Sequence, residues 1–166
     1  MPKKRSQVSP INADQYMEFI KSVHLSGLGI DAASFKIDRE GFAASFPEMG
    51  KPSAQISVGN EVVHQKSDSF VILGKYKVSV KGKSGTDVVD ISCTCSAMFS
   101  VEKEFDQACL ERFMRNEVQL VFWPYLRHFV SDSTYRMAIY PLILPLTSEI
   151  RAQESEKTKG RRVAHV

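Results

Sequence analysis

Three cysteines and four histidines are the side chains of this sequence best suited to bind a metal ion or attack a substrate. Cys93 and Cys95 are two residues apart, so on a strand they point the same way, and the candidate partners for a zinc ion are Cys109, His24, His64 and His128. Zinc sites usually combine a CxxC pair with closely spaced histidines, and this sequence has neither. We therefore interpret the cysteines as small buried apolar side chains and expect neither metal nor cofactor.

The sequence also lacks the residue patterns of common catalytic sites. His128 and Asp132 lie one helical turn apart, which indicates a pair on a helix surface and not a catalytic triad. There is no GxSxG motif, no glycine-rich phosphate loop and no HExxH motif. We predict that the protein is not an enzyme.

Cysteine content and hydropathy indicate where the protein works. The odd number of cysteines does not make a disulfide framework. No apolar run is long enough to cross a bilayer, and the basic start is not followed by an apolar core. We expect a cytoplasmic protein.

The net charge of +3 comes largely from the two ends of the chain, which carry Lys3, Lys4, Arg5, Lys157, Lys159, Arg161 and Arg162. Residues 1–11 and the polar tail 151–166 are predicted to be disordered, and 12–150 to form a single domain. A second basic group, Lys75, Lys77 and Lys81, shares one face of a predicted strand. Nucleic-acid binding is an alternative for this face, but without interleaved aromatics we interpret it as a solvated strand surface.

The first half of the domain has helical spacing and then a looser pattern. Asn12 is a candidate N-cap for an amphipathic helix over about 13–22. A long, irregular strand is expected over about 24–37 and another over 55–64. Residues 39–53 between them contain turn-forming Gly and Pro and are predicted to be a loop.

The clearest signal is a hairpin of two strands. Apolar and polar residues alternate over 69–81 and again over 87–102, with a Gly- and Ser-containing turn at 82–86. Each strand is therefore expected to bury one face against a core.

After the hairpin the period changes to that of a helix. One helix is expected to end near Asn116, and a second covers about 118–135, with Pro124 marking its start or a kink. Pro141 and Pro145 exclude a regular helix in the following apolar segment, which should be extended. The order of elements predicts an α+β fold with helices on one side of an antiparallel sheet.

The stretch FWPYLRHFVSDSTYRMAIYPLILP, residues 122–145, resembles the signature region of the SecB family. The elements that carry the resemblance are Phe122, Pro124, Tyr125, Arg127, Arg136, Tyr140, Pro141, Leu142, Leu144 and Pro145, with Trp123 as an extra residue in the first step. The preceding strand, CTCSAMFSV, is similar in position. The resemblance covers roughly 69–145.

This resemblance implies a fold and a function. SecB is a homotetramer, a dimer of dimers, with a four-stranded antiparallel sheet and a crossover loop between its first two strands. It binds unfolded polypeptides in apolar grooves without nucleotide or metal and passes preproteins to the translocase motor. We therefore expect an ATP-independent chaperone (a holdase) for unfolded or non-native polypeptides.

Two features depart from the export chaperone. The outward face of strand 69–81 is basic, so an acidic surface that would dock on the translocase motor is not evident. The N-terminal helix and the basic tail instead bring to mind the SecB-like chaperones of toxin–antitoxin modules. A chaperone dedicated to an antitoxin is therefore the alternative.

The residues expected to bind a client are apolar side chains outside the clear strand cores, because mobile Met and planar aromatic groups tolerate varied partners. They are Phe42, Phe46, Met49, Phe105, Phe113, Met114, Tyr140 and Leu142. The second helix has apolar residues on more than one side, so a second subunit is expected to cover Val121, Trp123, Leu126, Phe129 and Val130.

Overall fold

The computed structural model describes residues 12–45 and 54–145 of the 166-residue chain. The predictions for 1–11, for 151–166 and for Phe46 and Met49 lie outside the described residues.

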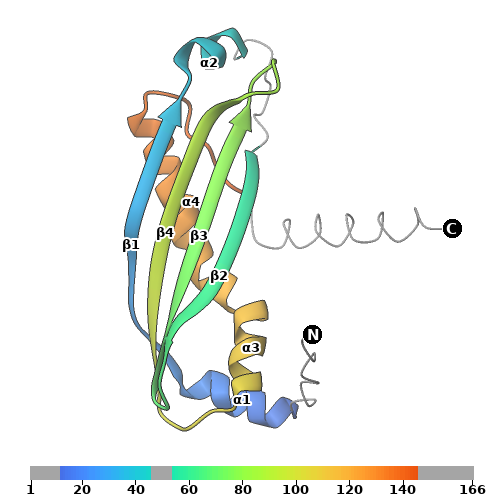
Figure 1. Ribbon diagram of the computed structural model, residues 1–166, viewed down its shortest axis with the longest axis vertical. Helices are drawn as coiled ribbons and strands as arrows, with labels where there is room; N and C mark the ends of the chain where they lie inside the picture. The colour runs from blue at the N-terminus through green and yellow to red at the C-terminus, as the bar shows by residue number, and fades with distance from the viewer. Residues whose placement is uncertain (1–11, 46–53, 146–166) are drawn as a thin grey trace, which may run out of the picture. The chain divides into compact units, whose positions relative to one another are not determined.

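Four strands form one antiparallel sheet in the order β1-β4-β3-β2 (Figure 1). Their bounds are β1 Val23–Ile37, β2 Ala54–Gln65, β3 Ser69–Lys81 and β4 Asp87–Val101. Because β1 and β2 lie at opposite edges, the connection between them has to cross from one edge of the sheet to the other. The predicted α+β fold with a Greek-key-like sheet and a crossover is confirmed.

The β3–β4 hairpin is buried as its alternating pattern predicts. Along β4 every second side chain from Val89 to Val101 is buried, and the residues between them are half-buried or exposed. The turn is closed by the Gly82 amide, which donates to the Thr86 carbonyl at 2.9 Å. Gly85 adopts a φ of 81°, a backbone conformation that favours glycine.

Four helices complete the described chain: α1 Ala13–Ser22, α2 Arg39–Ser45, α3 Gln107–Asn116 and α4 Val118–Arg136. The predicted cap of α1 is present, because the Asn12 side chain accepts the Asp14 amide at 3.1 Å. Asp106 caps α3 in the same way through the Ala108 amide.

The short helix α2 falls within the stretch predicted to be a loop. The carboxylate of Asp38 accepts the Gly41 amide at 3.0 Å, and the hydroxyl of Ser45 donates to the Gly41 carbonyl. These local bonds stabilise a turn of helix in a segment whose Gly and Pro content is typical of a loop.

The chain divides into two compact units that interleave along the sequence and share the four strands. The described part of unit 1 comprises 12–34, 56–77 and 92–118, and that of unit 2 comprises 35–45, 54–55, 78–91 and 119–145.

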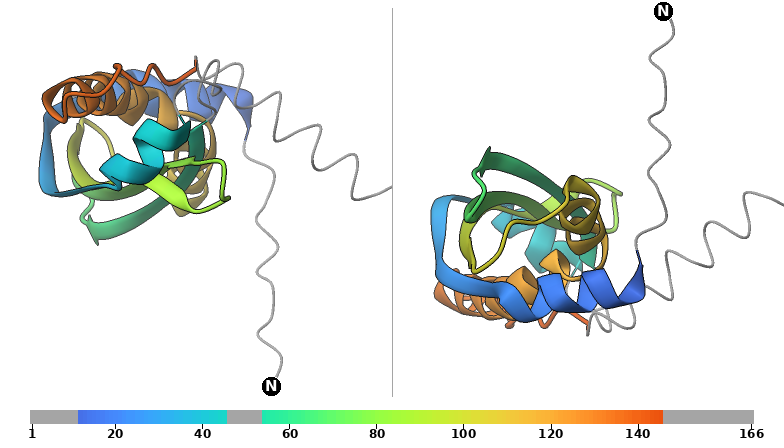
Figure 2. Two further views of the ribbon diagram at one scale, coloured as in Figure 1. Left: turned by 90° about the horizontal axis from the view of Figure 1, so that it is seen from above. Right: turned by 90° about the horizontal axis from the view of Figure 1, so that it is seen from below.

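Unit 1 contains a cluster of aromatic rings from four elements. Phe70 on β3 stacks on Phe99 on β4 at 4.9 Å between ring centroids, and Phe113 on α3 meets both rings edge-on. Phe19 on α1 contacts Phe70 and Phe113, and α1 packs against α3 (Figure 2). Such ring pairs stabilise the fold beyond their area of burial, so this cluster fixes α1 and α3 on the hairpin.

Unit 2 is organised around α4. Phe122, Leu126 and Val130 are buried on one side of this helix, and the Phe129 ring contacts Phe35 of β1 at 5.5 Å. The helix continues through Pro124 without ending there. Proline removes the hydrogen bond to the carbonyl of Leu120, and because Leu120 is exposed, water can take its place.

Candidate functional site

Residues 140–145, named the strap here, follow α4 without forming a helix or a strand, and side chains of α4 hold their backbone in place. The Trp123 indole N–H donates to the Pro145 carbonyl and the Arg127 Nε–H to the Leu144 carbonyl, both at 2.9 Å. The Leu142 amide donates to the buried hydroxyl oxygen of Thr134, also at 2.9 Å. Three side chains of α4 thus fix the backbone of the strap.

The strap begins at a reversal of the chain after α4. Ala138 adopts a left-handed φ of 57°, and the Ile139 amide donates to the Thr134 carbonyl at 3.2 Å. A left-handed residue after the last turn is a common way to end a helix, although glycine usually occupies it.

The side chains of the strap differ in burial. Leu142 and Leu144 are buried, whereas Tyr140 is 74% and Ile143 is 71% exposed. A large exposed aliphatic side chain and an exposed tyrosine, on a fixed backbone, provide apolar surface that another chain can cover. The strap is therefore the first candidate site.

The structure separates the residues that the sequence predicted to bind a client. Tyr140 is exposed, whereas Phe113 is buried in the aromatic cluster and Leu142 is a buried residue of the strap, so the chain itself covers both. The remaining described members, Phe42, Phe105 and Met114, are half-buried.

The residues predicted to form a subunit interface also differ in their burial. Trp123, Leu126 and Val130 are buried within the single chain, so they need no second subunit to shield them. Sequence reasoning counted only the sheet as a cover for α4, but the strap, which receives the Trp123 hydrogen bond, also packs here. Val121 and Phe129 are half-buried.

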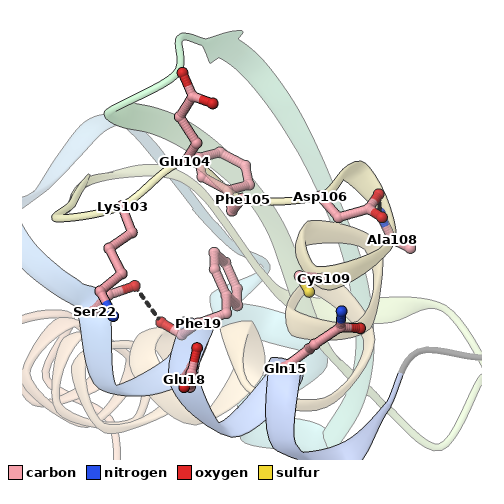
Figure 3. Close-up of a pocket in the computed structure, with 10 residues that line it drawn as sticks. All are labelled: Gln15, Glu18, Phe19, Ser22, Lys103, Glu104, Phe105, Asp106, Ala108 and Cys109. Carbon is pink, nitrogen blue, oxygen red and sulfur yellow. Dashed lines mark hydrogen bonds between the residues drawn. The ribbon is translucent and has the colours of Figure 1, made fainter.

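A second candidate site lies in unit 1, where a cavity of about 280 Å³ opens beside α1 (Figure 3). Its apolar part consists of the rings of Phe19 and Phe105, whose centroids lie 5.3 Å apart, together with Cys109 and Ala108. Its polar part comprises Gln15, Glu18, Ser22, Lys103, Glu104 and Asp106.

Sequence reasoning missed Ile143 and most of this cavity. The alternation along the strap could have indicated Ile143, since Leu142 and Leu144 flank it. The cavity has no comparable signal, because its wall combines α1 with the loop before α3, which are some eighty residues apart in the sequence.

The cysteines lie where an apolar interpretation places them. Cys93, Cys95 and Cys109 are free and buried, and the sulfur atoms of Cys93 and Cys95 are 3.9 Å apart. The hydrogen bond shared with Cys95, in which Cys93 keeps its proton, and burial raise the pKa of Cys93. Within 12–45 and 54–145, no three His, Cys, Asp or Glu side chains gather closely enough to hold a metal ion.

No helix in the described parts of the chain combines the length and the apolar composition needed to cross a membrane.

Among solved structures, the fold is similar to that of the Mycobacterium tuberculosis SecB-like chaperone Rv1957, solved in complex with a ChAD peptide from the Rv1956 HigA1 antitoxin. That similarity has a TM-score of 0.62 at 18% identity and covers 76% of this chain and 91% of the other. A protein of unknown function from Streptococcus agalactiae matches at a TM-score of 0.46 and 14% identity, over 75% of this chain and 97% of that one. No protein-family model and no curated protein matches the chain. The chain thus has the SecB-like fold that its sequence motifs suggested.

Proposed function

We propose that this protein is a molecular chaperone that binds segments of non-native polypeptide without nucleotide. The observation that carries the proposal is the strap, which presents Tyr140 and Ile143 to solvent on a backbone fixed by three hydrogen bonds. A chaperone needs apolar surface that its own core does not cover, and the strap offers it. The likeness to a solved SecB-like chaperone that carries a peptide supports the same activity here.

The energetics favour weak contacts at several sites over one tight site. Covering one large apolar side chain contributes about 1.5–3 kcal/mol. Two such side chains therefore fall short of the roughly 8 kcal/mol that a micromolar dissociation constant requires. A long client that contacts several straps, or a strap and further surfaces, gains the difference through multivalency.

Several finer features belong to the proposal. Binding at the strap requires no catalytic group, and we propose that the protein acts without catalysis. We propose that the protein forms a homotetramer, a dimer of dimers. Four copies of the chain would offer four straps to one unfolded client, as the multivalent binding described above requires. On β3, Lys75 pairs with Glu61 at 2.7 Å and Lys81 is exposed. These basic residues do not form an acidic surface on which a translocase motor could dock. We therefore propose that the protein holds its client and do not propose a transfer to the motor.

A chaperone dedicated to one antitoxin is the second candidate. It is favoured by the similar structure, whose peptide comes from an antitoxin. The two candidates differ in breadth: a general chaperone binds many unfolded chains with similar affinity, whereas a dedicated one co-purifies with a single polypeptide.

The test is the suppression of aggregation. We expect the purified protein, without nucleotide, to keep a reduced, unfolded test protein soluble at micromolar concentration, and light scattering measures this. Failure to bind any unfolded chain at that concentration would contradict the proposed function. Native mass measurement of the protein with whatever polypeptide accompanies it then distinguishes the two candidates.

A further inference from the structure

We infer that the solvent-facing side of the sheet in unit 1 docks an acidic segment of a second protein, in which Asp or Glu side chains alternate with apolar ones. This surface, named the outer face here, is formed by β2, β3 and β4. The inference goes beyond the proposed function, because this partner is not an unfolded client and does not occupy the strap.

Alternation along the strands defines which side chains belong to the outer face. On β3 the side chain of Tyr76 is buried in the core, so Lys75 and Lys77 on either side of it point the other way and are exposed. The neighbouring strand β2 is aligned with β3 by an ion pair, in which the Lys75 Nζ and the Glu61 Oε1 are 2.7 Å apart. Glu61 therefore shares the outer face with the two lysines.

An open depression of about 400 Å³ lies beside Gly59, among these outward residues. Gly59 leaves it open, because a Cβ built at this position would meet no atom within 4 Å. The ammonium groups of Lys75 and Lys77 line the depression together with three hydroxyl groups, those of Ser57, Ser92 and Thr94. Ammonium and hydroxyl groups both donate hydrogen bonds, so the depression suits a carboxylate from a partner.

Apolar side chains border the depression on the same side of the sheet. Val63 on β2 is 53% and Met98 on β4 is 52% exposed, and Val71 and Leu73 on the strand between them are half-buried. Leu73 shares the face of Lys75, because two residues separate equivalent positions on a strand. The solvated face of an antiparallel sheet is usually polar, so this group indicates a surface that another chain covers.

The charges of the outer face select the partner. Lys75 and Lys77 contribute two positive charges and Glu61 one negative charge, so the net charge of these three side chains is +1. A polypeptide with one or two carboxylates beside apolar side chains complements this surface. A nucleic acid fits less well, because its binding depends on many phosphate contacts and on aromatic stacking, and the outward residues named above include no aromatic ring.

The inference is tested by methyl NMR on the full chain with two synthetic peptides. Each probe has three Leu residues between Gly/Ser ends, which alternate with two Asp in one peptide and with two Lys in the other. We expect the Asp peptide to bind roughly fivefold more tightly at low salt, with the preference falling as salt is added. Its binding should shift the methyl signals of Val63, Val71, Leu73 and Met98.

A double charge variant locates the preference. Lys75→Gln with Lys77→Gln should make the two peptides bind equally, without affecting the fold, because both lysines are exposed. Lys21→Gln with Lys36→Gln is the matched control. It removes two exposed lysines of α1 and β1, outside the depression, and should leave the preference unchanged.

A second variant fills the depression. Gly59→Val should weaken the Asp peptide about fivefold while the chain remains folded, because the added side chain enters open space and valine favours a strand. Gly29→Val on β1 is the matched control, since a Cβ at Gly29 also meets no atom within 4 Å, and it should leave the binding unchanged. If Gly59→Val does not fold, the lysine variants still decide the question.

Two results with the peptides would overturn the inference: equal binding of both by the native chain, or a preference that survives the double lysine variant. Three further results would assign the outer face to another occupant and overturn it as well. Displacement of the Asp peptide by an unfolded test protein would assign it to the client. Shifts of the Val63 and Met98 methyl signals with protein concentration alone would assign it to a second copy of the chain. Stronger shifts of these signals with a thymidine oligonucleotide would assign it to nucleic acid.

The outcome for the outer face can be distinguished from that for the proposed function. If the inference fails while an unfolded test protein is still kept soluble, the proposed function stands. If no unfolded chain binds but the Asp peptide does, the proposed function fails and the docking surface remains.

Discussion

Each of the two units is stabilised internally by a different kind of interaction. In unit 1 the rings of Phe19, Phe70, Phe99 and Phe113 pack on one another and are buried. In unit 2 the strap is held chiefly through its backbone, by hydrogen bonds with Trp123, Arg127 and Thr134, while Tyr140 and Ile143 face solvent.

The difference shows how one small chain can both keep a stable fold and present apolar surface that binds another polypeptide. Apolar side chains that pack inside a core stabilise the fold but cannot contact a client. A segment fixed through its backbone keeps its alternate apolar side chains available. Stability and binding should therefore respond to different substitutions, and the following predictions test this separation.

The largest effect is expected in the aromatic cluster. Phe70→Ala removes a fully buried ring that contacts four others, and should lower the free energy of unfolding by about 3–5 kcal/mol. Tyr140→Ala, on the strap, should change it by less than about 0.5 kcal/mol. Urea denaturation measures both, and equal losses would contradict the division between the units.

A smaller loss is expected at the hydrogen bond between α4 and the strap. Thr134→Val keeps the shape of the side chain but leaves the Leu142 amide without its acceptor, at a cost of about 1–3 kcal/mol. Thr134→Ser retains the hydroxyl and is the control. The Leu142 amide should exchange its hydrogen faster in the valine variant, and unchanged exchange would mean that this bond does not hold the strap.

Client binding should respond most strongly to the outward residues of the strap. Tyr140→Ser with Ile143→Ser should weaken binding of an unfolded test protein about tenfold or more, since covering two large side chains contributes several kcal/mol. The free energy of unfolding should stay within about 1 kcal/mol. Met17→Ser on α1 removes another exposed apolar side chain and is the control; if it weakens binding equally, the strap has no special role.

The smallest effect at neutral pH is expected for Tyr16. Burial, and next the negative charge of Glu117, raise the pKa of its hydroxyl to about 12. The folded state therefore favours the neutral phenol, and the stability that this contributes is complete below pH 10 and is lost as the pH rises from 10 to 12.

Tyr16→Phe should remove this alkaline loss, measured as unfolding free energy against pH. At pH 7 the variant should be at least as stable as the parent, because the Tyr16 hydroxyl is buried without a hydrogen-bond partner among the described residues. Burial raises the pKa of Tyr76 as well, so some alkaline loss should remain in the variant. An unchanged pH profile would contradict the assignment to Tyr16.

Patterns that repeat along the chain predicted much of this fold. The alternation of β3 and β4 and the spacing in α1 depend on neighbours in sequence, so the elements are found within a residue or two of the predicted bounds. The helix α2 was not predicted because the side chains that stabilise it, Asp38 and Ser45, are residue types that are equally common in loops.

The candidate sites were harder to predict because they depend on partners distant in sequence. Nothing local indicates that Thr134 binds the amide of Leu142, or that Phe105 lies beside Phe19. For the same reason Phe113 and Tyr140 looked equivalent in the sequence, although one is buried in a core and the other is exposed.

The most direct test of the account is a titration of a fluorescently labelled, permanently unfolded protein with the native chain and with the Tyr140→Ser, Ile143→Ser variant, in the absence of nucleotide. We expect micromolar or tighter binding by the native chain and binding at least tenfold weaker by the variant, with the two proteins equally stable. No binding by the native chain, or equal binding by both proteins, would contradict it.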